Sequence, residues 1–125
     1  MRRPKRGEQV PPPPVANEWD LRYATKESLA FAELERQSPG NCAEAKARLK
    51  TTPTTRSDAQ KPLRGTLGTR TIGGVEMTQW QYDISAGARL WYCVDNDNRI
   101  VWLTLAAAGH PRATDAKGKR APRNR

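Results

Sequence analysis

The chain has 125 residues and a formal net charge of +9, with 36% apolar and 28% charged residues. This length supports one folded core but not two, because two smaller cores would each bury too little apolar surface to offset chain entropy. The charge lies at the ends, since residues 1–8 contribute +3 and residues 110–125 contribute +5, which leaves +1 for the residues between them. Such ends promote encounters with polyanions such as nucleic acid, or they only keep the protein soluble, and composition leaves both open.

The cysteines and the N-terminal composition restrict the compartment. Cys42 and Cys93 are too few and too far apart for a metal-ligand cluster or a secreted disulfide framework, so we expect two buried, reduced thiols. The first residues are charged, but only the prolines 11-PPPP-14 follow them, which is unlike a signal peptide or a membrane span. We therefore expect a cytoplasmic protein with no membrane partner, no metal and no small-molecule cofactor.

Two predicted segments open the chain. Residues 1–17 are basic and rich in proline, which predicts a disordered, extended arm that is mobile without a partner. The next run, 18-EWDLRY-23, places Trp19, Leu21 and Tyr23 at alternating positions. This alternation predicts a short strand with one buried face.

A helical hairpin is expected next. The segment 26-KESLAFAELERQ-37 contains no glycine or proline and is rich in helix-forming residues. A Ser-Pro-Gly break ends it, and a second helix would run through Leu49 and bury Cys42, Ala45 and Leu49.

The second half of the chain predicts a loop and then a sheet. Residues 51–65 are polar and contain two prolines, so we interpret them as a surface loop. Strand-like alternation follows in the four runs 67–72, 75–84, 88–95 and 99–106, which are separated by short polar turns. The prediction is a twisted antiparallel meander covered by the two helices on one face, which is an α+β fold.

The alternation also assigns residues to the two faces of this sheet. In the second run Trp80, Tyr82 and Ile84 share a face, and in the third run Arg89 and Trp91 lie opposite Leu90 and Tyr92. The last run is apolar on both faces, so we expect it at the centre of the sheet or covered on both sides.

Arg89 is the first candidate for chemistry, because a buried arginine must find a partner for its charge. One interpretation is an ion pair with Asp83 across the hairpin and stacking on Trp91. The other is a guanidinium held on a rigid strand to bind a phosphate through two hydrogen bonds.

His110, the only histidine, follows the last predicted strand and is the second candidate. A single histidine at a strand end is commonly an incidental polar residue, but its ordinary pKa near neutrality suits a general acid or base. Arg112 lies close enough in sequence to help hold an anion. Glycine-rich phosphate loops and paired carboxylates are absent, and arginine, lysine and histidine suit an RNA phosphodiester whose 2′-hydroxyl is the nucleophile.

The stretch 87-GARLWYCVDNDNRIVWLTLAAAGHPRATD-115, together with 61-KPLRGTLG-68 and 79-QWQYDI-84, resembles the RelE/ParE superfamily of bacterial type II toxins. The resemblance is to the RelE-like side and covers about residues 18–115, leaving a basic tail at 116–125. It implies a small α+β toxin that cleaves messenger RNA, often at the ribosome, and that a cognate antitoxin silences.

The resemblance also implies roles for single residues. Arg89 matches the strand arginine that contacts the scissile phosphate, His110 falls where members place an acid–base residue, and Arg112 is a candidate second phosphate contact. Two features depart from the RelE pattern. Trp80 and Tyr82 stand where RelE carries lysines, and the tail has no base-stacking tyrosine. The residues expected to contact RNA are Lys61, Arg64, Arg70, Tyr82 and Trp91.

Two other functions remain open at this point. A ParE-like protein would share the scaffold but inhibit DNA gyrase without cutting nucleic acid. A non-catalytic nucleic-acid-binding module would act through its basic ends, and its binding would depend strongly on salt.

Overall fold

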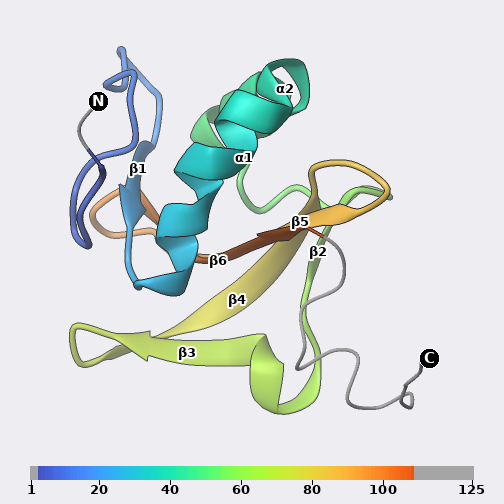
Figure 1. The fold of residues 1–125 in the computed structure, drawn as a ribbon. Helices are drawn as coiled ribbons and strands as arrows, with labels where there is room; N and C mark the ends of the chain where they lie inside the picture. The colour runs from blue at the N-terminus through green and yellow to red at the C-terminus, as the bar shows by residue number, and fades with distance from the viewer. Residues whose placement is uncertain (1–2, 109–125) are drawn as a thin grey trace.

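A six-stranded mixed sheet, with two helices on one of its faces, forms the body of the protein (Figure 1). The computed structural model describes residues 3–108. The elements in chain order are β1 (Asp20–Tyr23), the 3₁₀ helix η1 (Glu27–Ala30), α1 (Phe31–Gln37), α2 (Pro39–Thr51), β2 (Gln60–Pro62), the 3₁₀ helix η2 (Gly65–Gly68), β3 (Thr69–Ile72), β4 (Val75–Asp83), β5 (Ala88–Asp95) and β6 (Ile100–Ala108). The predicted α+β class is confirmed.

The strand order is β1-β6-β5-β4-β2, and β3 pairs with the other end of β4. The four strands β3 to β6 form the antiparallel meander that the alternation predicts. β6 lies between β5 and β1, which agrees with its apolar residues on both faces. β1 pairs with β6 in parallel, with Leu21 opposite Val101, so the first and last strands of the described residues are neighbours.

The helical hairpin is present, but its first half begins differently from the prediction. Residues 27–30 form a 3₁₀ turn before α1 starts at Phe31. The hydroxyl of Thr25 accepts the N–H of Ser28 at 3.1 Å, and the Ser28 hydroxyl donates to the Thr25 carbonyl at 2.7 Å. These local bonds favour the tighter turn. The helix α2 begins at Pro39 and includes Leu49.

The core lies between the helices and one face of the sheet. Cys42, Ala45 and Leu49 of α2 are fully buried, as predicted. Trp80 and Tyr92 stack on the sheet side with ring centroids 6.3 Å apart. The largest fully buried side chains are those of Tyr23, Tyr92, Phe31, Leu21, Leu49, Leu90 and Leu103.

The expectation that residues 51–65 form only a surface loop is wrong. Residues 60–62 form β2, which pairs with β4 at the sheet edge. Gln60 is 2% exposed, and its side-chain amide donates to the carbonyl of Thr52 at 2.6 Å. Because this hydrogen bond satisfies the buried amide, Gln60 is tolerated inside the fold although it is a polar residue in a segment with the composition of a loop.

The N-terminal arm, which the sequence led us to expect as mobile, packs on the outer edge of β1. The N–H of Val10 donates to the carbonyl of Leu21 at 2.7 Å, and Val10 is fully buried. The ammonium groups of Lys46 and Lys50 donate to the carbonyls of Pro11 and Pro12 at 2.9 and 2.7 Å. The arm therefore covers a strand edge that would otherwise present unpaired backbone groups.

Candidate functional site

The two faces of the sheet differ in what covers them. The helices α1 and α2 lie over one face, as Figure 1 shows. Strand alternation puts a second set of side chains on the opposite face, which α1 and α2 do not cover and which we call the helix-free face. On β4 and β5 its members are Gln79, Gln81, Asp83, Arg89, Trp91 and Cys93, and the register pairs them as Gln79 with Cys93, Gln81 with Trp91 and Asp83 with Arg89.

Arg89 is held at one end of the helix-free face. Its Nε lies 3.4 Å from Oδ1 of Asp83, and its side chain is 12% exposed. Its Nη1 donates to the carbonyls of Ser85, Ala86 and Ala88 at 3.2, 3.3 and 3.4 Å. The ion pair across the hairpin, which was one of the two interpretations of Arg89, is therefore present. The turn carbonyls compensate the charge further.

Asp83 and Arg89 are part of a longer chain of hydrogen bonds. The indole N–H of Trp91 donates to Oε1 of Gln81 at 2.9 Å, and Nε2 of Gln81 donates to Oδ1 of Asp83 at 3.1 Å. Trp91 is 3% exposed. Its ring is buried and its indole N–H is already bonded, so the ring is not available to stack on a base. The expected role of Trp91 as an RNA contact is therefore not supported by its position.

Cationic side chains lie beside this hydrogen-bonded chain. Lys61 of β2 pairs with Gln81, and Arg70 of β3 pairs with Met77, so both belong to the helix-free face. Lys61, Arg70 and also Arg64, which immediately precedes η2, are exposed. The structure thus brings two of the predicted RNA contacts, Lys61 and Arg70, to the face that carries Arg89.

Tyr82 lies on the other face, so its expected role as an RNA contact is not supported by its position. It is 6% exposed and belongs to the core beneath the helices. Burial raises the pKa of its hydroxyl, and the carboxylate of Glu44 on α2 raises it further. The phenol therefore stays neutral at physiological pH and is shielded from a ligand.

The sequence reasoning did not single out a second polar group on the helix-free face. The hydroxyl of Thr104 lies 2.6 Å from Oε1 of Gln79, to which it donates, and Nε2 of Gln79 donates to the carbonyl of Leu67 at 2.8 Å. Thr104 is fully buried. The available signal was three polar residues, Gln79, Gln81 and Asp83, at alternate positions of a strand whose other face is apolar.

A β-bulge in β6 shifts its pairing with β5. Tyr92 pairs with Leu103 while Trp91 pairs with Leu105, so Thr104 is the extra residue. After the bulge, Ala107 pairs with Arg89 and Ala108 with Ala88. The predicted site residues His110 and Arg112 lie outside the described residues.

The cysteines do not add a nucleophile to the candidate site. Both are free and buried, as expected for structural thiols. Burial raises the pKa of Cys93 to about 11, although Arg70 lowers it in part, and burial also raises the pKa of Cys42. Within residues 3–108 no group of three or more His, Cys, Asp or Glu side chains is arranged to hold a metal ion.

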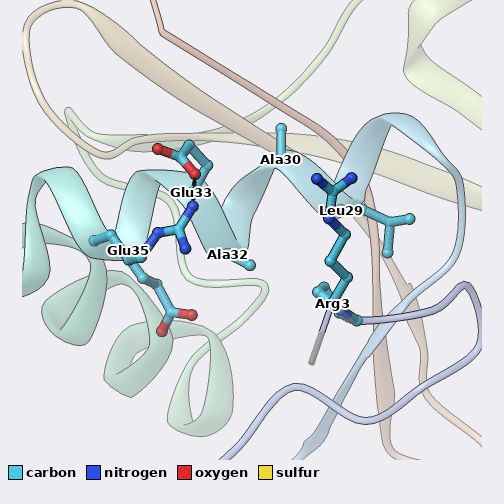
Figure 2. Close-up of a pocket in the computed structure, with 8 residues that line it drawn as sticks. Arg3, Leu29, Ala30, Ala32, Glu33 and Glu35 are labelled. Carbon is cyan, nitrogen blue, oxygen red and sulfur yellow. Dashed lines mark hydrogen bonds and ion pairs between the residues drawn. The ribbon is translucent and has the colours of Figure 1, made fainter. Parts of the chain in front are cut away.

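A surface pocket lies away from the helix-free face. It has a volume of about 760 Å³ and lies between the arm, represented by Arg3, and residues of η1 and α1, as Figure 2 shows. Its charges are mixed: Glu33 and Arg36 form an ion pair within it, and the hydrogen bond from Arg36 lowers the pKa of Glu33. None of the candidate RNA-contacting residues lines this pocket, so it does not extend the candidate site.

The chain matches no protein-family model, no curated protein and no solved structure. The RelE-like resemblance therefore stays a prediction from the sequence. In the part of the chain that the structure describes, no helix is both long and apolar enough to cross a membrane.

Proposed function

We propose that this protein is the toxin of a bacterial type II toxin–antitoxin system that cleaves messenger RNA in the cytoplasm in association with the ribosome. The 2′-hydroxyl of the substrate gives up its proton to a base and attacks the adjacent phosphorus, and the bond to the 5′-oxygen of the next nucleotide breaks. That oxygen takes up a proton, which leaves a 2′,3′-cyclic phosphate on the other fragment. Arg89 contacts the scissile phosphate, His110 transfers a proton and Arg112 provides a second phosphate contact. A cognate antitoxin protein is the expected partner.

The observation that carries this proposal is the register of β5 and β6. Arg89 pairs with Ala107, and β6 ends at Ala108. His110 lies outside the described residues and follows Ala108 by two positions in the sequence. Arg89, the phosphate-binding candidate, thus lies at the end of the sheet where β6 ends.

The environment of Arg89 supports a role in binding an anion. Its Nε faces Asp83 and its Nη1 faces the turn carbonyls, while Nη2 has no hydrogen-bond partner among residues 3–108. A fixed guanidinium nitrogen with an unused donor stabilises the charge that develops on a phosphorane. Lys61 and Arg70 supply further positive charge on the same face.

The ion pair between Asp83 and Arg89 favours a second candidate function. A carboxylate that already compensates the guanidinium lowers its attraction for a phosphate. Under this alternative the protein binds nucleic acid through Lys61, Arg70 and its basic ends, and it cleaves nothing.

The test is inducible expression in a bacterium, with transcript 5′ ends mapped after induction. Arg89→Ala and His110→Ala are compared with wild type, and Arg56→Ala serves as the control because Arg56 is exposed and lies in the loop before β2. We expect growth arrest and new transcript ends in the wild type and the control. Loss of a positioned donor at Arg89 reduces cleavage about 100- to 1,000-fold.

Two outcomes would overturn the proposal. New ends that persist in a folded Arg89→Ala variant would remove the site from this end of the sheet. Growth arrest without new ends would move the function to DNA gyrase or another protein target.

A further inference from the structure

Each bonded nitrogen of the Arg89 guanidinium is directed by a different part of the molecule. Asp83 faces Nε, and three carbonyls of the β4–β5 turn accept from Nη1. We infer that Asp83, Gln81 and Trp91 are positioning residues that orient Arg89 so that Nη2 points to the phosphate. This inference rests on the proposed function, because it assigns a role to Arg89 in the reaction.

The orientation of Asp83 depends on two further side chains. Its Oδ1 accepts from Nε2 of Gln81 and faces Nε of Arg89, so a single oxygen is shared between the amide and the guanidinium. Gln81 is fixed in turn by the indole N–H of Trp91 at 2.9 Å. Bonding of both ends of the Gln81 amide defines which way its nitrogen points.

The positioning residues Trp91, Gln81 and Asp83 lie on two paired strands, β4 and β5. Gln81 pairs directly with Trp91, and Asp83 pairs directly with Arg89, so the two pairs are neighbours on the same face of β4 and β5. Trp91 is 3% exposed, so its indole has little freedom to rotate. Side chains locked by packing and by second hydrogen bonds hold a functional group more accurately than a loop does.

The contact between Asp83 and Arg89 is a weak source of stability. Its length of 3.4 Å exceeds the roughly 2.7–2.9 Å of a tight charge-assisted hydrogen bond. Asp83 is partly exposed, at 31%, and such pairs contribute about 0–1 kcal/mol. Loss of the Asp83 contact alone should therefore disturb the direction of Arg89 more than the stability of the fold.

The kinetic consequence follows from where the cations lie. Lys61 and Arg70 are exposed on other strands of the helix-free face, and they remain available to hold the RNA backbone. An interaction made mainly in the transition state affects kcat, while uniform binding affects KM. Misdirection of Arg89 should therefore lower kcat about 10- to 100-fold and leave KM within about threefold.

The experiment uses the full-length protein with a messenger RNA and purified bacterial ribosomes. Trp91→Phe removes the indole donor while it keeps an aromatic ring, and Gln81→Leu removes both amide bonds. The matched control is Trp102→Phe, because Trp102 is half-buried on the same face and its Nε1 has no hydrogen-bond partner in the described residues. We expect a lower kcat in the first two variants and wild-type kcat in the control.

A second readout measures the position of Arg89 without any cleavage. The NMR order parameter of its Nε–H group should fall in Gln81→Leu, and should not change in Trp102→Phe. An unchanged order parameter in Gln81→Leu overturns the positioning role. If the order parameter falls but the wild type cleaves no RNA, the orientation of Arg89 is supported and the proposed function fails.

Discussion

The two faces of the sheet are built from the same strands, yet they behave as different kinds of surface. Beneath the helices, alternate residues of β4 and β5 such as Tyr82, Leu90 and Tyr92 join the apolar core. On the helix-free face, Gln81, Asp83 and Arg89 bond to one another instead.

The difference shows how one strand serves two purposes. A period of two separates side chains that stabilise the fold from side chains that are free to carry chemistry. Substitutions on the helix-covered face should therefore change stability first. Substitutions of the exposed residues on the helix-free face, such as Lys61 and Arg70, should change stability far less.

The largest expected effect belongs to the helix-covered face. Phe31 is fully buried at the start of α1. Phe31→Ala removes its contacts and leaves a cavity, which costs about 3–5 kcal/mol of the free energy of unfolding. Urea denaturation followed by circular dichroism measures this loss. A loss below about 1 kcal/mol would contradict the assignment of Phe31 to the core.

High pH provides a second test of the helix-covered face. Burial raises the pKa of Tyr23 to about 12, with further contributions from Glu35 and Glu8. The hydroxyl ionises near pH 10 in the unfolded chain, so its contribution is complete below about pH 10 and is lost as the pH rises toward about 12. The free energy of unfolding should fall by about 2 kcal/mol over this range.

Urea denaturation at about pH 8, 10, 11 and 12 measures this effect, and the difference in tyrosinate absorbance between the wild type and Tyr23→Phe shows when this phenol ionises. Tyr23→Phe is the control and should make the decline smaller by this amount, while the raised pKa values of Tyr82, Cys42 and Cys93 account for the rest of it. A decline of the same size in Tyr23→Phe would show that another group is responsible.

The smallest effect on stability belongs to the exposed cations of the helix-free face. Lys61→Ala and Arg70→Ala should each change the free energy of unfolding by less than about 0.5 kcal/mol, because both side chains are exposed. If each contacts one phosphate, each change should reduce the salt dependence of single-stranded RNA binding by about 0.7 in log–log slope. Fluorescence anisotropy across a salt series tests this, with Arg56→Ala as the control.

Much of the fold could be predicted because it depends on local patterns. Alternation assigned the faces of β4 and β5, and the apolar faces of β6 indicated its central place. The parallel pairing of β1 with β6 could not be read from either segment, since nothing in their side chains selects the partner strand. The strand β2 has only three residues and a polar sequence typical of a loop. The hydrogen bond from the Gln60 amide to the Thr52 carbonyl, which allows Gln60 to be buried, is not visible in the sequence.

The candidate site was predictable to a smaller degree. Asp83 and Arg89 lie at equal distances from the turn between them, so their pairing followed from the hairpin register. The bonds of Gln81 depend on side-chain rotamers, which the sequence pattern does not specify. The expected RNA contact at Tyr82 could have been rejected from the sequence, because strand alternation already placed Tyr82 on the other face from Arg89. His110 and Arg112 lie outside the described residues, so their roles stay predictions.

The central place of β6 has a consequence for the synthesis of the protein. Translation produces β1 and β5 first, but each of them needs residues 100–108 as its neighbour in the sheet. A nascent chain that ends before Ile100 therefore leaves one edge of β5 unpaired and β1 without its partner strand. Because this contact spans about eighty residues, the fold closes late during synthesis. A protein with this topology completes its sheet, and with it the surroundings of Arg89, only when nearly all of the described chain has been made.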